Sequence, residues 1–158
     1  MEPLGEEPQS LVGVSRDVPS APLDDAEVRR VVEAALEHGG RAGVAIDVVL
    51  VDDPTLAELH GRFLGDPSPT DVMSFDLGED EPGPVGELYV SVDRAREVAA
   101  QRGVAFEREL ALYLVHGTLH LCGHDDHESE DRARMREAEA EVMSALGYEP
   151  DEAPHDVD

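Results

Sequence analysis

Apolar and β-branched residues are concentrated in three short segments that are typical of strands. Residues 44–51 are almost continuously apolar, which indicates a strand covered on both faces. Residues 72–77 and 87–92 instead alternate between apolar and polar positions, as half-buried strands do. These segments predict a small sheet.

Apolar residues at helical spacing predict helices around these strands. Asp24 or Asp25 can cap a first helix that ends at Gly39. Asp53 and Asp93 are candidate caps of two shorter helices. The apolar faces of the first and last helices consist of Val28, Val31, Val32, Ala35, Leu36, Met135, Ala138, Val142, Met143 and Leu146.

The predicted order of elements is helix, strand, helix, strand, strand and three helices. This order favours an α+β domain in which a small mixed sheet has helices packed against one side. We expect one domain at residues 23–148, a disordered leader at residues 1–22 and an acidic disordered tail at residues 149–158. Both ends mix acids with proline, which opposes packing into a core.

Two histidines interrupt the most apolar stretch of the chain. Residues 110–127 read LALYLVHGTLHLCGHDDH, in which His116 and His120 lie four residues apart. On a helix of about 3.6 residues per turn, this spacing puts both imidazoles on one face. Because uncharged imidazoles need polar partners in apolar surroundings, the pair predicts a site for one zinc ion.

A third ligand is expected after Gly123, which can end the helix and turn the chain back. Metzincin proteases space their ligands as H-x-x-x-H-x-x-G-x-x-H, and this register puts Asp126 in the third position. A carboxylate oxygen is an acceptable zinc ligand, so the predicted ligands are His116, His120 and Asp126. His127 is the alternative third ligand, because a bulge of one residue in the turn would bring it into place.

Gly117 follows the first histidine, where zinc peptidases of the H-E-x-x-H type carry a glutamate that acts as general base. Glycine cannot accept a proton, which disfavours ordinary proteolysis. A bound metal lowers the pKa of its water to about 7 and polarises phosphoryl oxygens, so hydrolysis of a phosphodiester does not require that glutamate. Tyr113 and Glu109 share the helix face of His116 and are candidates to support the site.

Three ordered segments carry a resemblance to a known family. They read LHGRFLGDPSPTDVMSF, GELYVSVDRA and HGTLHLCGHDDH. They are similar to the motifs L-N-x-x-[FY]-R-x-x-D-x-P-T-D-V-L-S-F, G-D-I-x-I-S-x-x-x-A and H-G-x-L-H-L-x-G-Y-D-H of the YbeY family of bacterial endoribonucleases and rRNA maturation factors. The likeness spans about residues 44–146 and implies a zincin-like fold with the metal-bearing helix beside the sheet.

The resemblance implies a zinc-dependent, single-strand-specific endoribonuclease that acts in rRNA maturation, at the 3′ end of the small-subunit rRNA, and in ribosome quality control. Its implied partners are rRNA, the small ribosomal subunit and assembly factors. Arg62 is the nearest match to the arginine of the upstream motif, and it is expected to hold the phosphate. The predicted catalytic residues are therefore Arg62, His116 and His120. The alternatives are a zinc-containing ribosome-assembly factor without catalysis and a metal hydrolase of peptides or other small substrates.

Charge and composition qualify this prediction. The formal net charge is −25, with 12 arginines and no lysine, which opposes a general attraction to RNA. Either the arginines gather near the metal or they pair with acids on helix surfaces; the relevant residues are Arg62, Arg94, Arg96, Arg102 and Arg108. No long apolar run or signal-peptide pattern is present, so we expect a cytoplasmic protein without a membrane partner.

Overall fold

Four strands form one mixed sheet in the order β1-β2-β4-β3. The computed structural model describes residues 11–65, 70–125, 127–150 and 157. β1 pairs with β2 and β2 with β4 in parallel, whereas β3 is antiparallel to β4 and lies at the edge. The predicted mixed sheet is confirmed, and its strands are β1 (Val12–Arg16), β2 (Ile46–Val51), β3 (Val72–Asp76) and β4 (Gly86–Ser91).

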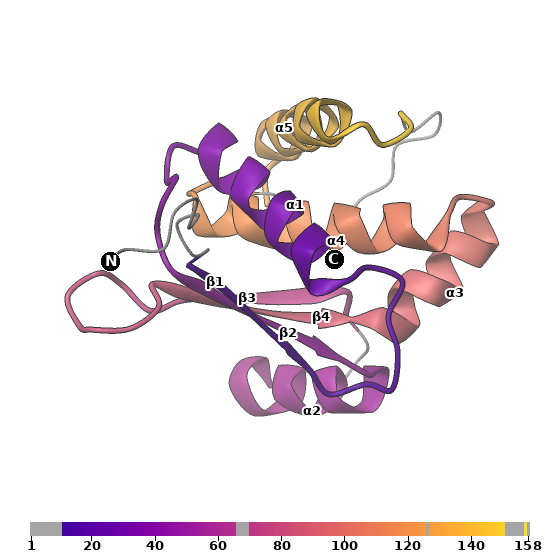
Figure 1. Cartoon of the computed structure of the whole chain (residues 1–158), viewed down its shortest axis with the longest axis horizontal. Coiled ribbons are helices and arrows are strands. Elements are labelled where there is room, and N and C mark those ends of the chain that lie inside the picture. The colour runs from indigo at the N-terminus through magenta and orange to yellow at the C-terminus, as the bar shows by residue number, and fades with distance from the viewer. Residues whose placement is uncertain (1–10, 66–69, 126, 151–156, 158) are drawn as a thin grey trace, which may run out of the picture.

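Helices cover both faces of this sheet (Figure 1). α4 lies with α1 and α5 on one face, whereas α2 lies alone on the opposite face. The expectation that helices pack on one side only is therefore wrong. The helices are α1 (Asp25–His38), α2 (Asp53–Leu64), α3 (Val92–Arg102), α4 (Phe106–Leu121) and α5 (Ser129–Leu146).

Strand β2 shows why the layers form. Its alternate residues Ile46, Val48 and Leu50 belong to the main core under α1 and α4, whereas Val51 belongs to a smaller core with Leu56 of α2. Successive side chains of a strand point to opposite faces, so a continuously apolar strand needs a cover on each side. The prediction of a strand covered on both faces is confirmed in part, because Val49 on the second face is only partly buried and Asp47 is exposed.

Strand β1 corrects the expected disordered leader. Residues 1–22 include Val12–Arg16, which pair in register with Ile46–Leu50 of β2. Val12 is fully packed in the main core, and Arg16 donates to the carbonyl oxygen of Leu23 and pairs with Asp25. Five residues with one buried apolar face give only a weak sequence signal, and the neighbouring strand supplies the missing backbone partners. Residues 1–10 lie outside the described residues.

Two helix caps differ from the predicted ones by one or two residues. Asp52, not Asp53, accepts the backbone N–H of Thr55 at the start of α2. Ser91, not Asp93, accepts the N–H of Arg94 at the start of α3. Neighbouring side chains of similar capping ability compete, and the approach of the preceding strand selects among them. The predicted helix ends at Gly39, Gly103 and Gly147 are confirmed.

Gly117 lets α4 lie close to the sheet. A Cβ atom at this position would lie 2.8 Å from Cγ2 of Val72 and 3.1 Å from Cδ2 of Leu88. The Ser74 hydroxyl donates to the carbonyl oxygen of Gly117 at 2.9 Å. The glycine is therefore required by packing, and it brings the middle of α4 against edge strand β3.

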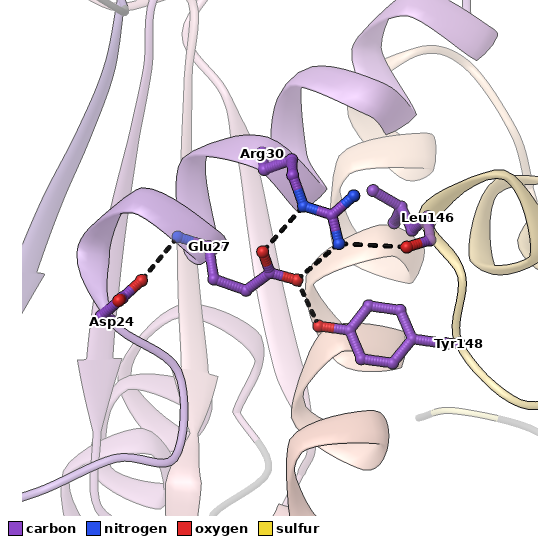
Figure 2. A network of polar contacts seen from close by, with 5 residues as sticks. All are labelled: Asp24, Glu27, Arg30, Leu146 and Tyr148. Atoms are coloured by element: carbon purple, nitrogen blue, oxygen red, sulfur yellow. Dashed lines mark hydrogen bonds and ion pairs between the residues drawn. The ribbon is translucent and has the colours of Figure 1, made fainter.

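A polar network joins α1 to the end of α5 (Figure 2). Arg30 donates from Nε and from Nη2 to the carboxylate of Glu27. Its Nη2 also donates to the carbonyl oxygen of Leu146. The Tyr148 hydroxyl donates to the same carboxylate at 2.6 Å. These contacts hold α5 across α1 and over α4.

Within the described part of the chain, no helix has the length and apolar character needed to cross a membrane.

Candidate active site

The two histidine side chains of α4 meet on one face of the helix. Nε2 of His120 lies 3.1 Å from Nε2 of His116, and the ring centroids are 4.6 Å apart with planes inclined at 76°. A spacing of four residues makes them neighbours along the helix, as predicted. Two imidazole nitrogens turned toward the same point can share a cation placed between them.

Glu139 of α5 supports this arrangement from the side opposite His120. Its Oε2 atom lies 2.5 Å from Nδ1 of His116, and only 5% of Glu139 and 3% of His116 are exposed. A carboxylate only accepts, so Nδ1 of His116 carries the proton and donates. The remaining nitrogen, Nε2, then presents its lone pair toward His120, which is the tautomer a metal ligand needs.

Sequence reasoning missed Glu139, although the chain contained a signal. The acid lies between Ala138 and Val142 on the apolar face of α5, four residues after Met135. An acid at a core position of an amphipathic helix requires a buried partner, because an uncompensated buried charge is costly. The sequence does not reveal which residue is that partner, because His116 is 23 residues away on another helix.

Edge strand β3 forms the wall next to the histidines. Its side chains alternate, so Val72 and Ser74 face α4 at Gly117 and the following Phe75 faces α2. β3 is an edge strand of the sheet, so α4 packs at the sheet border here. The sheet edge and one turn of α4 therefore bound the candidate site.

Two ion pairs hold α3 to its neighbours: one reaches α4, and the other reaches Asp71 just before β3. Arg102 donates to Glu109 at 3.1 Å, and Arg94 donates to Asp71 at 3.1 Å. Burial, with the charges of Asp71 and Glu109, raises the pKa of Tyr113, so its hydroxyl stays protonated. Tyr113 and Glu109 are both buried, and Glu109 ties α4 to α3 through Arg102. Their expected support of the histidine site stays a prediction.

Four of the five arginines considered for a basic patch near the metal bind acids or backbone oxygens of the described residues. Arg94 and Arg102 pair with the buried acids Asp71 and Glu109, and Arg96 pairs with Asp93 within α3. Arg108 donates to the backbone carbonyl of Glu149. Three of the five arginines thus pair with acids, but only the Arg96–Asp93 pair lies on a helix surface as expected, because Asp71 and Glu109 are buried.

Arg62 lies in the last turn of α2, and its guanidinium lies 5.7 Å from the centroid of the Phe63 ring. α2 covers the face of the sheet opposite α4, so Arg62 and the histidines belong to different layers (Figure 1). Its predicted contact with a phosphate stays a prediction.

The third ligand is not decided by the described residues. Asp126 lies outside them. His127 is exposed, with Nε2 3.5 Å from Asp125, and the described residues contain no group of three or more His, Cys, Asp or Glu side chains placed to hold a metal ion. The turn itself is as predicted: Gly123 has φ +100°, and the N–H of His124 donates to the carbonyl oxygen of Leu119.

The fold and the site together define a class: an α/β sandwich with a carboxylate-supported histidine pair on a central helix, an arrangement used by metal-dependent hydrolases. The family described as Endoribonuclease YbeY matches residues 17–147. The chain belongs to this family, and the resemblance noted in its three motifs is confirmed.

Relatives and a solved structure agree with this assignment. Endoribonuclease YbeY of Symbiobacterium thermophilum is 42% identical over 132 residues, which cover 76% of this chain and 85% of that protein. Endoribonuclease YbeY of Salinibacter ruber is 34% identical over 154 residues, covering 92% and 96%. The solution structure of TM1509 from Thermotoga maritima matches with a TM-score of 0.55 and 25% identity, covering 92% of this chain and 99% of that one.

Proposed function

We propose that the chain is a zinc-dependent endoribonuclease of single-stranded RNA whose hydrolytic centre is built on His116 and His120. Membership of the family makes it an endoribonuclease, a hydrolase of RNA phosphodiester bonds, with a role in rRNA processing. The observation that carries the location of the centre is the 3.1 Å approach of the two Nε2 atoms, with Glu139 holding the far nitrogen of His116.

The residues present fit a transition metal. Both ligating atoms are imidazole nitrogens, one of them is held in the tautomer that a metal requires, and His116 is almost fully buried. Asp126 would complete the set, with His127 as the alternative. When bound, zinc supplies a hydroxide at neutral pH and polarises the scissile phosphoryl group. A zincin-like arrangement, with the ligand helix beside the sheet edge, is part of this proposal.

The chain's own residues have separate tasks in the proposed reaction. Glu139 keeps the proton of His116 on Nδ1, so that its Nε2 stays available. Gly117 provides no general base, and Val72 fills the space that a glutamate side chain would need, so proteolysis of the H-E-x-x-H type is disfavoured. Arg62 is the proposed phosphate-binding group, since a guanidinium can hold two phosphate oxygens at once.

The proposed substrate is the 3′ end of the small-subunit rRNA, with the small ribosomal subunit and its assembly factors as partners and a further role in ribosome quality control. A cytoplasmic location follows from these partners. Because the formal net charge of the chain is −25, RNA needs a locally positive electrostatic potential in order to approach it. A ribosomal particle or assembly factor would also serve, because it can present the RNA end without general attraction.

The test is cleavage of single-stranded RNA, duplex RNA and peptides by the purified protein, with and without a chelator. We expect cleavage of single-stranded RNA only, loss with chelator and recovery on adding zinc. His120→Ala is expected to abolish cleavage. His38→Ala is the matched control, because His38 pairs with Glu141 on the surface between α1 and α5. Cleavage that survives both the chelator and His120→Ala would contradict the proposed centre, and zinc retention without any cleavage would favour an assembly factor.

A further inference from the structure

Three aromatic rings form a row on the α2 side of the sheet. The Phe63 ring at the end of α2 lies 5.3 Å from that of Phe75 in β3, which lies 5.7 Å from that of Tyr89 in β4. Both contacts are edge-to-face, the geometry that aromatic pairs prefer. Phe63 is 58% exposed, so the row begins at the surface and runs into the smaller core.

The exposed end of this row carries a cation. The guanidinium of Arg62 lies 5.7 Å from the centroid of Phe63. A single exposed apolar side chain needs no explanation, but here an aromatic ring is braced from below by Phe75 and accompanied by an arginine. Proteins bind unpaired nucleotides with this combination, since a base stacks on the ring while its phosphate pairs with the cation.

The row and the histidine pair lie on the two sides of the same edge strand. Ser74 of β3 bonds to Gly117 of α4 on one side, and the next residue, Phe75, contacts Phe63 on the other. β3 is at the border of the sheet, so its outer edge has no neighbouring strand in the described sheet. The path that the proposal requires for a single strand of RNA crosses this edge, between the aromatic row and the histidines.

Charge determines which end of the row suits a nucleotide. Burial and then the negative charges of Glu87 and Asp47 raise the pKa of Tyr89. It is the two neighbouring carboxylates that disfavour a phosphate at the Tyr89 end. The Phe63 end has Arg62 instead. A chain of net charge −25 gains little affinity for RNA from general attraction to phosphates. Stacking of bases on an aromatic ring contributes to RNA affinity without such attraction.

We propose that Phe63, braced by Phe75 and flanked by Arg62, is a stacking site for an unpaired base of the RNA substrate. The inference rests on the proposed function, because it takes RNA as the substrate. It adds a specificity element that lies outside the histidine centre: a requirement for an unstacked base at a fixed distance from the cleaved bond. Duplex RNA cannot offer such a base, which gives a physical reason for single-strand preference.

The test uses the zinc-loaded protein and a single-stranded RNA with 2-aminopurine at successive positions, mixed rapidly so that binding is read before cleavage. We expect one position at which fluorescence is quenched. Phe63→Leu should remove this quenching and weaken binding about tenfold, the order of one lost base stack, whereas Phe63→Tyr should retain both. Leu64→Ala is the matched control, because Leu64 is the adjacent residue, 66% exposed and not aromatic.

An abasic nucleotide at the quenched position provides a second measurement. It should weaken binding to the unaltered protein and leave binding to Phe63→Leu unchanged. Equal thermal unfolding of all variants, expected from the exposure of Phe63, excludes misfolding as the cause. If the unaltered protein cleaves RNA but Phe63→Leu binds and quenches like it, the stacking site alone is wrong. If the unaltered protein neither binds nor cleaves RNA, the proposed function is wrong as well.

Discussion

Oε2 of Glu139 lies 2.5 Å from Nδ1 of His116, so a buried carboxylate on α5 determines which nitrogen of a histidine on α4 carries the proton. Both side chains are almost completely buried. Water therefore cannot substitute for the carboxylate, and the contact links the packing of the last helix to the chemistry of the site.

Replacing Glu139 should weaken metal binding without unfolding the protein. Glu139→Gln retains an acceptor but lacks the charge that favours the Nδ1–H tautomer of His116. We expect zinc affinity to fall about 10- to 100-fold, the usual effect of replacing a group that hydrogen-bonds a metal-bound histidine. Competition with a chromophoric chelator measures this directly. Glu137→Gln is the control, because Glu137 lies on the exposed side of the same helix. Unchanged affinity in Glu139→Gln would mean that the carboxylate serves packing only.

Zinc content of single variants should identify the third ligand. His116→Ala and Asp126→Ala are expected to lose most of the metal, whereas His127→Ala should keep it. His127 is exposed and lies beside Asp125, which agrees with a side chain outside the ligand set. The opposite result for Asp126 and His127 would establish the alternative register with a bulge in the turn.

Gly117→Ala should destabilise the fold although alanine favours helices. Helix propensity alone predicts a gain of about 1 kcal/mol. The added Cβ, however, would lie 2.8 Å from Cγ2 of Val72, a stiff β-branched side chain, so we expect a net loss of about 1–3 kcal/mol in the free energy of unfolding. Urea denaturation measures this free energy. Ala133→Gly, on the exposed side of α5, is the control that measures the effect of helix propensity where no packing changes. A more stable Gly117→Ala would show that α4 can move away from β3.

Acid should weaken the link between α1 and α5. The hydrogen bond from Arg30, followed by that from Tyr148, lowers the pKa of Glu27 below its ordinary value of 4.5 (Figure 2). A lowered folded-state pKa contributes stability above the ordinary pKa, and this stability is lost as the pH falls below that value through the lowered pKa.

Glu27→Gln should therefore cost about 1 kcal/mol near neutral pH and progressively less in acid, which urea denaturation at several pH values would show. Glu37→Gln serves as the control, because Glu37 is exposed near the end of the same helix. A cost for Glu27→Gln that does not change with pH would contradict the role of the charged carboxylate.

The sequence by itself determined the features that depend on local geometry. The helical period placed His116 and His120 on one face, and glycines at 39, 103, 123 and 147 predicted where helices end, because only a residue without Cβ takes the left-handed turn cheaply at most of these positions. A continuous apolar run predicted one strand and apolar alternation predicted two more, each within two residues of its observed bounds.

Only the tertiary structure decided the features that depend on partners far away along the chain. Val12–Arg16 become a strand because β2 offers a parallel edge, and α2 moves to the opposite face because Val51 and Met73 need a cover there. Glu139 is recognised as part of the site only when α5 crosses α4, and Phe63 meets Phe75 only when α2 packs under β3. Local periodicity specifies which side of an element is apolar, but the contact that fills that side is selected by the packing of the whole core.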